Sequence, residues 1–162
     1  MTSLEADTKH GNIISGLEAA ESLHTDIKKE IEIIKKCKNS YITSFPRLDV
    51  VIVGDRQDSI TYVRNKGIAC EKVGILQQCH SFPSDITQVD LENAIEKLNN
   101  DATVTAILIQ LPLPNHLDSE AVVDRISPYK DADGLTTTNL GLLMRKGMSC
   151  ASLLLYCLEI VP

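Results

Sequence analysis

Two short apolar runs constrain the fold of this chain more than any other feature of its sequence. Residues 48–53 are a leucine, an aspartate and four β-branched residues, and residues 104–109 are apolar except for one threonine. Such runs are typical of strands that are covered on both faces, as in parallel sheets. Residues 75–82 predict a further strand, so we expect a mostly parallel sheet.

The segments between these strands have the three- and four-residue spacing of helices. A long helix is predicted within residues 13–38, where the periodic apolar positions are Leu17, Ala20, Leu23, Ile27, Ile31 and Ile34. Three shorter helices are predicted at residues 60–73, 89–98 and 119–126. Ser59 stands where a helix cap would lie and Gly74 is a plausible C-terminal stop, while residues 127–138 are a predicted loop. The alternation predicts an α/β domain of three layers (αβα), with helices on both faces of the sheet, over residues 1–148.

Composition argues against several classes of protein. The net charge is −6 and the sequence pI is near 5.2, so we expect no nucleic-acid partner. No apolar stretch reaches the ~20 residues of a membrane span, and no targeting peptide is evident. We therefore expect no membrane association, and a cytoplasmic rather than a mitochondrial location. Five cysteines and four histidines are scattered without metal-ligand spacing, which predicts reduced thiols and no metal site.

Polar residues follow the predicted strands at the ends where ligands bind in an open parallel sheet. Gly54, Asp55 and Arg56 follow the first apolar run, and Gln110 follows the run at residues 104–109. The loop at residues 130–134 meets the same condition. Because polar groups from several strand ends converge there, these segments predict one binding site.

Tyr62 and Lys66 are the first candidates for chemistry. They are four residues apart on a predicted helix, so both project from one face, next to the turn at Gly54. Partial desolvation of a lysine favours its neutral form, which can exchange a proton near neutral pH. The alternative is a surface lysine whose stem lies over Tyr62.

Gln110 and the two aspartates of residues 130–134 also allow two interpretations. A buried amide must find partners, so Gln110 either bonds loop backbone or orients a catalytic neighbour or ligand. Asp131 and Asp133 precede Gly134, and Asp-Gly pairs readily mark turns. The functional alternative is a carboxylate that accepts hydrogen bonds from a heteroaromatic amine.

Three segments together resemble the methylenetetrahydrofolate dehydrogenase/methenyltetrahydrofolate cyclohydrolase family. Residues 54–66 end in Tyr-Val-Arg-Asn-Lys, which is similar to the loop and YVxxK helix of that family. Residues 109–114 match its QLPLP segment, and residues 130–135 resemble its KDVDG motif, with Ala132 in place of valine. The three segments occur in order and at suitable spacing, and the resemblance covers residues 12–146.

The resemblance implies that a tetrahydrofolate derivative binds in a cleft between two domains. Lys66 would be the central catalytic residue, and Gln110 would hydrogen-bond Lys66 and hold it in place. Tyr62 would stack on the aromatic part of the folate and act with these catalytic residues, and Asp133 would bind the amino edge of the pterin. Further substrate-binding positions would be Leu111, Pro112 and Ser59.

The sequence departs from the family after the third segment. Complete enzymes continue with a Rossmann domain that binds NADP or NAD, whereas only 28 residues follow Gly134 here, without a G-x-G-x-x-G motif. We expect residues 149–162 to be a divergent tail, the Rossmann domain to be absent, and no nucleotide cofactor to bind this chain tightly. Two functions stay open: a cyclohydrolase, or an inactive module that binds folate or associates with full-length subunits. A homodimer is a further expectation from the family.

Overall fold

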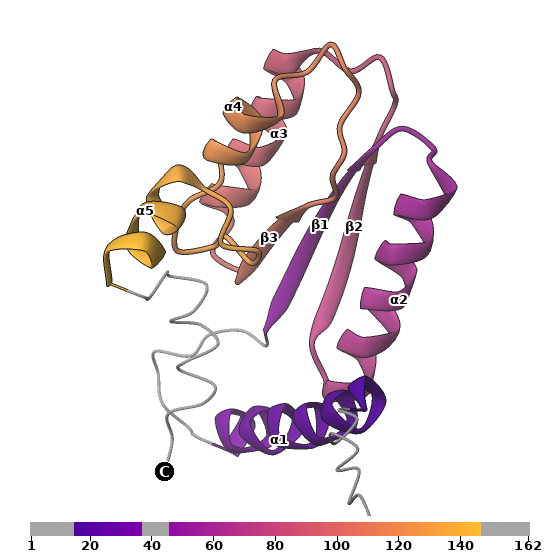
Figure 1. Cartoon of the computed structure of the whole chain (residues 1–162), viewed down its shortest axis with the longest axis vertical. Coiled ribbons are helices and arrows are strands. Elements are labelled where there is room, and N and C mark those ends of the chain that lie inside the picture. Colours follow the sequence, from indigo (N-terminus) through magenta and orange to yellow (C-terminus); the bar gives the residue numbers. More distant parts are fainter. Residues whose placement is uncertain (1–14, 37–45, 147–162) are drawn as a thin grey trace, which may run out of the picture.

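A parallel sheet of three strands forms the centre of the structure, which is a computed structural model that describes residues 15–36 and 46–146. The strand order is β2-β1-β3, and all pairings are parallel, as predicted (Figure 1). The strands are β1 (Arg47–Val53), β2 (Leu76–Phe82) and β3 (Ala106–Ile109). An isolated parallel bridge between Ile107 and Asp131 continues the sheet beyond β3. The predicted tail at residues 149–162 lies outside the described residues.

Helices cover both faces of this sheet, which confirms the three-layer prediction. On one face lies α2 (Gln57–Val73), against which α1 (Gly16–Lys36) packs. The other face carries α3 (Gln88–Asn100) and α4 (Ser119–Asp124). No helix among residues 15–36 and 46–146 is long and apolar enough to cross a membrane.

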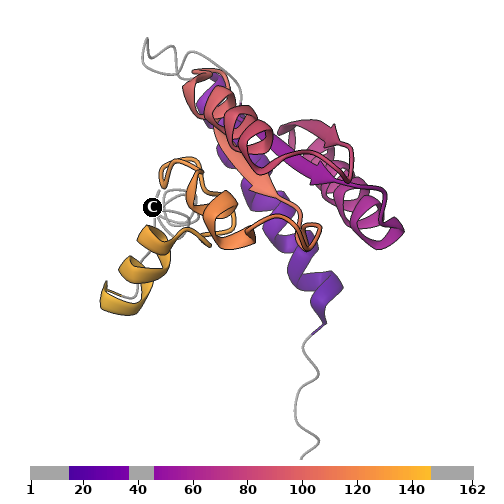
Figure 2. The same ribbon diagram turned by 90° about the horizontal axis from the view of Figure 1, so that it is seen from above.

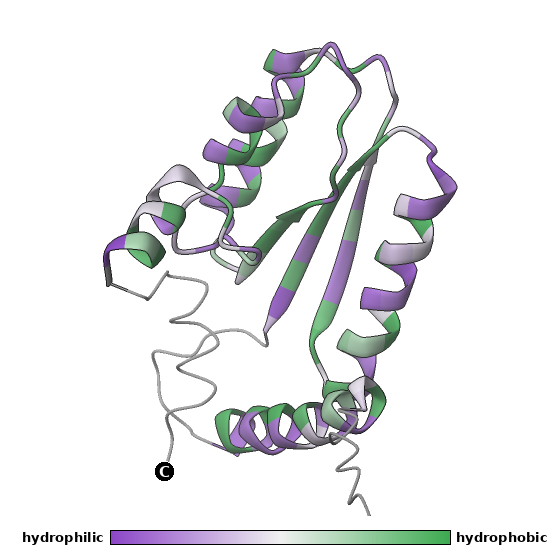
Figure 3. Cartoon of the chain, viewed as in Figure 1, coloured by the Kyte–Doolittle hydropathy of each residue, from purple (hydrophilic) through white to green (hydrophobic). Residues whose placement is uncertain are grey.

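Alternate residues of β1 supply the two cores. Val50 and Ile52 pack with Val63 of α2, whereas Val51 and Val53 belong to the core that contains Leu91 of α3. Figure 3 shows β3 and the end of β1 as mostly apolar, between helices whose outer faces are hydrophilic. A strand buried on both sides needs apolar residues at nearly every position, which explains the apolar runs in the sequence. The exception in β1, the buried Asp49, is bonded to Arg47 and His80.

The structure corrects the predicted start of α2 and the predicted end of α4. Helix α2 begins at Gln57 with Arg56 as the N-cap residue, so Ser59 is not the cap but a buried residue of the first turn. Gly74 does end the helix, with a left-handed φ of 88° that favours glycine. Helix α4 ends at Asp124, before the predicted residue 126.

One helix was not predicted from the sequence, and its first two residues lie in the predicted loop. Helix α5 (Thr137–Lys146) begins inside the predicted loop at residues 127–138 and lies beside α4, away from α2 (Figures 1 and 2). Its first residue is held by a tertiary contact, because the carboxylate of Asp124 accepts bonds from the amide and the hydroxyl of Thr137, both at 2.6 Å. A run of three threonines has low helix propensity, so this contact was not predictable from local sequence.

Candidate functional site

The carboxyl ends of β1 and β3 lie at one edge of the sheet and bring two of the predicted segments together. Gln110 follows β3 directly, and its backbone amide donates to the carbonyl of Val51 in β1 at 2.8 Å. At the end of β1, Gly54 has a φ of 82°, which turns the chain toward α2. The strand ends therefore place Gln110 beside the start of the helix that carries Tyr62 and Lys66.

Tyr62 and Lys66 lie one turn apart on the same face of α2, beside the buried Val63. The ring of Tyr62 is 64% exposed, so most of it is accessible to a ligand. Lys66 is half-buried, and it makes no hydrogen bond or ion pair within the described ranges 15–36 and 46–146. The ammonium of Lys66 is therefore not used to hold the fold together.

Asp133 lies within electrostatic reach of Lys66, although 67 residues separate them in the sequence. Much of Asp133 is open to solvent, but burial of its carboxyl raises its pKa, and the charge of Lys66 opposes that rise. The Asp133 side chain accepts no hydrogen bond from any residue that the structure describes. A lysine and a carboxylate that have no hydrogen-bond or ion-pair partner among the described residues thus lie within electrostatic reach of each other.

The nitrogen and the oxygen of the Gln110 side-chain amide correspond to the two predicted roles. Its Nε2 donates to the carbonyl of Leu111 at 2.9 Å, which is the loop-backbone interpretation. Its Oε1 is buried and has no hydrogen-bond partner in the described part of the chain. A buried amide oxygen without a donor is costly, and a ligand group or an ammonium would satisfy it. Leu111 and Pro112, predicted to contact substrate, follow at the surface and are joined by a cis peptide bond.

The three charged residues of the 130–134 segment have separate environments. The ammonium of Lys130 donates to three carbonyls at the end of α3, those of Leu98, Asn99 and Asp101, at 2.7–3.1 Å. Asp131 is 1% exposed and accepts the backbone amides of the following turn. The turn interpretation therefore describes Asp131, and Asp133 alone presents an unbonded carboxylate.

Ser59 lies nearby but points into the protein. It is 5% exposed, and its amide donates to the Asp58 carboxylate at 2.9 Å. Hydrogen bonding from Arg56 lowers the pKa of Asp58 to about 2, with a further contribution from that amide. Arg56 and Asp58 form an exposed ion pair at the start of α2.

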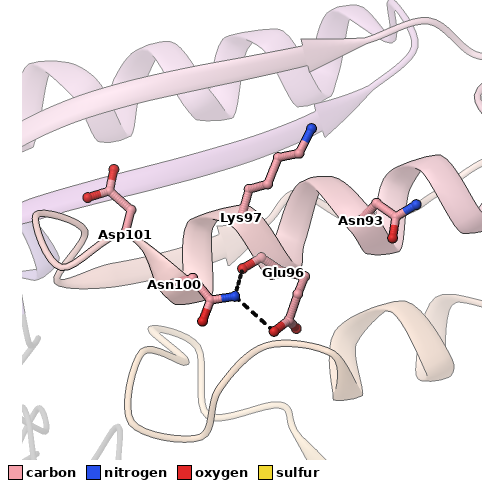
Figure 4. A pocket seen from close by; sticks show the side chains of 5 residues that line it. All are labelled: Asn93, Glu96, Lys97, Asn100 and Asp101. Carbon is pink, nitrogen blue, oxygen red and sulfur yellow. Dashed lines mark hydrogen bonds between the residues drawn. The ribbon is translucent and has the colours of Figure 1, made fainter.

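A separate depression of about 570 Å³ lies at the opposite end of the sheet (Figure 4). Its lining residues are Asn93, Glu96, Lys97, Asn100 and Asp101. Asp101 precedes the amino end of β3, whereas Gln110 follows the carboxyl end. The amide of Asn100 donates to the carbonyl and the carboxylate of Glu96, so its polar group is already satisfied within α3. Nothing in this depression adds to the chemistry at the other edge.

Comparison with known proteins identifies relatives over most of the chain. Residues 14–133 match the family model described as tetrahydrofolate dehydrogenase/cyclohydrolase, catalytic domain. The bifunctional protein FolD of Nitrosopumilus maritimus is 47% identical over 136 residues, which are 84% of this chain and 46% of the relative. The bifunctional protein FolD of Bdellovibrio bacteriovorus is 44% identical over 129 residues, or 80% and 43% of the two chains.

Two solved structures share the fold. A 5,10-methylenetetrahydrofolate dehydrogenase from the silkworm, Bombyx mori, superposes with a TM-score of 0.78 at 36% identity, covering 83% of this chain and 45% of that one. The Trypanosoma brucei N5,N10-methylenetetrahydrofolate dehydrogenase-cyclohydrolase, complexed with NADP and an inhibitor, gives a TM-score of 0.77 at 32% identity, with coverage of 86% and 46%. The chain thus spans less than half the length of these relatives.

Proposed function

Because the chain belongs to the tetrahydrofolate dehydrogenase/cyclohydrolase family, through its catalytic domain, we propose that it binds a tetrahydrofolate derivative and promotes hydrolysis of 5,10-methenyltetrahydrofolate. One observation carries this proposal. Lys66 and Asp133, neither of which has a hydrogen bond or ion pair to any described residue, lie within electrostatic reach of each other. Two ionisable groups that the fold leaves unbonded are suited to proton transfer and to ligand binding.

Lys66 has the central role in the proposed reaction. Water adds to the methenyl carbon and loses a proton, which Nζ of Lys66 accepts. The bond from this carbon to one of its two nitrogens then breaks as that nitrogen gains the remaining proton of the added water. The methenyl carbon is already electrophilic, so a proton shuttle and a fixed substrate meet the requirements of this step.

The other predicted residues would bind the folate or orient Lys66. The buried Oε1 of Gln110, which has no donor among the described residues, would accept a hydrogen bond from Lys66 and fix its position. The exposed ring of Tyr62 would stack on the aromatic part of the folate. The carboxylate of Asp133 would accept hydrogen bonds from the amino edge of the pterin. Leu111 and Pro112 would supply backbone contacts, and the burial of Ser59 limits it to a supporting contact.

The dehydrogenase step of the family requires NADP or NAD, and the described residues do not fit such a cofactor. A dinucleotide pyrophosphate needs a glycine-rich turn at the start of a helix. The turn before α2 instead contains Asp55, Asp58 lies in the first turn of α2, and α3 is capped by Thr87. The proposed hydrolysis needs no nicotinamide. Assembly as a homodimer, or with full-length subunits, belongs to the same proposal and can be tested by light scattering.

The proposal is tested by following 5,10-methenyltetrahydrofolate hydrolysis optically with the purified chain. Lys66→Met should reduce the rate above buffer by at least about a hundredfold, the usual contribution of a general acid–base group. Lys72→Met is the matched control, since Lys72 is an exposed lysine in the last turn of the same helix, and it should retain the full rate. Equal rates for the wild type and Lys66→Met would contradict hydrolysis by this chain and favour the binding or association module.

A further inference from the structure

The turn that carries Asp133 is organised around the buried carboxylate of Asp131. Oδ1 of Asp131 accepts the amides of Gly134 and Leu135, at 2.9 and 3.3 Å, and Oδ2 accepts the amide of Thr136, at 2.9 Å. Asp131 is 1% exposed, and no cation forms an ion pair with it among the residues that the structure describes. Three backbone amides therefore converge on one carboxylate immediately after Asp133.

Asn139 of α5 completes this arrangement. Its Nδ2 donates to Oδ2 of Asp131 at 2.9 Å and to the carbonyl of Pro128 at 3.0 Å. Asn139 is fully buried, and its backbone amide donates to the hydroxyl of the buried Thr136 at 3.3 Å. The first turn of α5 is thus bonded directly to the residue that organises the preceding loop.

The amino-terminal side of the turn is held by β3. The amide of Ile107 donates to the carbonyl of Lys130 at 2.6 Å, and the amide of Ala132 donates to the carbonyl of Ile107 at 3.1 Å. The backbone on each side of Asp133 is therefore fixed, by β3 before it and by the Asp131 carboxylate after it. Asp133 is the one carboxylate of the segment that these bonds leave without a hydrogen-bond donor in the described chain.

We propose that Asp131 and Asn139 are positioning residues that hold the Asp133 carboxylate in its place near Lys66 and couple that placement to helix α5. This inference rests on the proposed function, because that function assigns Asp133 to the ligand. An asparagine at position 131 would keep one acceptor oxygen but turn its amino group toward at least one backbone amide that needs an acceptor, so the turn would open. Asp133 would then lose its place near Lys66 while keeping its own side chain.

The test measures the pKa of the Asp133 carboxyl by NMR titration of the full chain. In the wild-type background, Lys66→Met should raise the pKa of Asp133, because the lysine charge lowers it. In an Asp131→Asn background the same Lys66→Met change should have no effect on that pKa. Asp118→Asn is the matched control background, since Asp118 also accepts two backbone amides, those of Glu120 and Ala121, but at α4. There Lys66→Met should act as in the wild type.

An equal response to Lys66→Met in the Asp131→Asn background would overturn the inference. If Asp131→Asn does not fold, Asn139→Ala serves in its place, because it removes a single bond to the carboxylate of Asp131 and leaves its three backbone amides in place. The Lys66 response should then be reduced, and a full response would overturn the inference.

A separate binding measurement distinguishes failure of the proposed function. Calorimetry with 5-formyltetrahydrofolate should show a Kd that Asp133→Asn weakens about tenfold or more, as expected for a charged hydrogen bond. Asp131→Asn should weaken the Kd similarly, and the double variant should be no weaker than Asp133→Asn alone. If Asp133→Asn leaves the Kd unchanged while the pKa experiment succeeds, the proposed function fails at Asp133 and the positioning role stands.

Discussion

The two sides of the candidate site are built in opposite ways. On α2, Tyr62 is largely exposed and Lys66 has no hydrogen bond or ion pair within residues 15–36 and 46–146. In the 130–139 segment, Lys130, Asp131 and Asn139 all use their polar atoms in internal hydrogen bonds. The difference separates residues kept available for a ligand from residues that hold one available carboxylate in place. Substitutions on the first side should change function with little effect on stability, whereas those that break the internal bonds of the second should lower stability as well.

The comparison is sharpest between Asp131 and Asp133, which are two residues apart. Asp131→Asn should lower the free energy of unfolding by about 3 kcal/mol, because the new amino group leaves at least one buried amide without its acceptor and removes a buried charge that is hydrogen-bonded. Asp133→Asn should cause no loss of stability at pH 7, because its carboxylate has no donor to lose in the described chain. Urea denaturation of both variants measures the difference. Equal losses would show that Asp133 also holds the turn.

Acid titration tests the same pair, because the two carboxylates should change the stability in opposite directions as the pH falls. Burial alone would raise the pKa of Asp131, but the hydrogen bonds from Asn139 and Thr136 lower it overall. Its stabilising effect is therefore complete above the unfolded pKa and is lost as the pH falls through the folded one. Burial raises the pKa of Asp133, so its effect is lost as the pH rises through the folded value. Asp131→Asn should flatten the acid loss of stability, and Asp133→Asn should steepen it.

Two lysines provide the next contrast. Lys130→Met should cost about 2 kcal/mol of stability, because three carbonyls at the end of α3 lose a charged donor. Lys66→Met should stay within about 0.5 kcal/mol of the wild type, as expected for a side chain without such bonds. Thermal unfolding by circular dichroism compares the two. A destabilised Lys66→Met variant would place Lys66 among the structural residues and break the comparison.

The sequence predicted the sheet better than it predicted which residues of the site are available to a ligand and which hold the fold. Continuous apolar runs identified β1 and β3, because each must bury side chains on both faces. Local sequence alone did not separate Asp131 from Asp133, and only the family resemblance singled out Asp133, because the bonds that give Asp131 its structural role are tertiary ones to residues 134–139. Asn139 was missed as a candidate for the same reason, since its partner lies in another element and its burial depends on α5.

Helix α5 escaped prediction because its start depends on α4, and this dependence gives the smallest effect in the series. Asp124→Ala removes the acceptor of the Thr137 amide and hydroxyl, two bonds at an exposed helix start. Loss of such a cap should cost about 1 kcal/mol, measured by urea denaturation. Hydrogen exchange should accelerate most at the amides of α5 and less at the amide of Gly134, because Asn139 links α5 to the Asp131 carboxylate that binds this amide. Unchanged protection at Gly134 would mean that the turn is not coupled to α5.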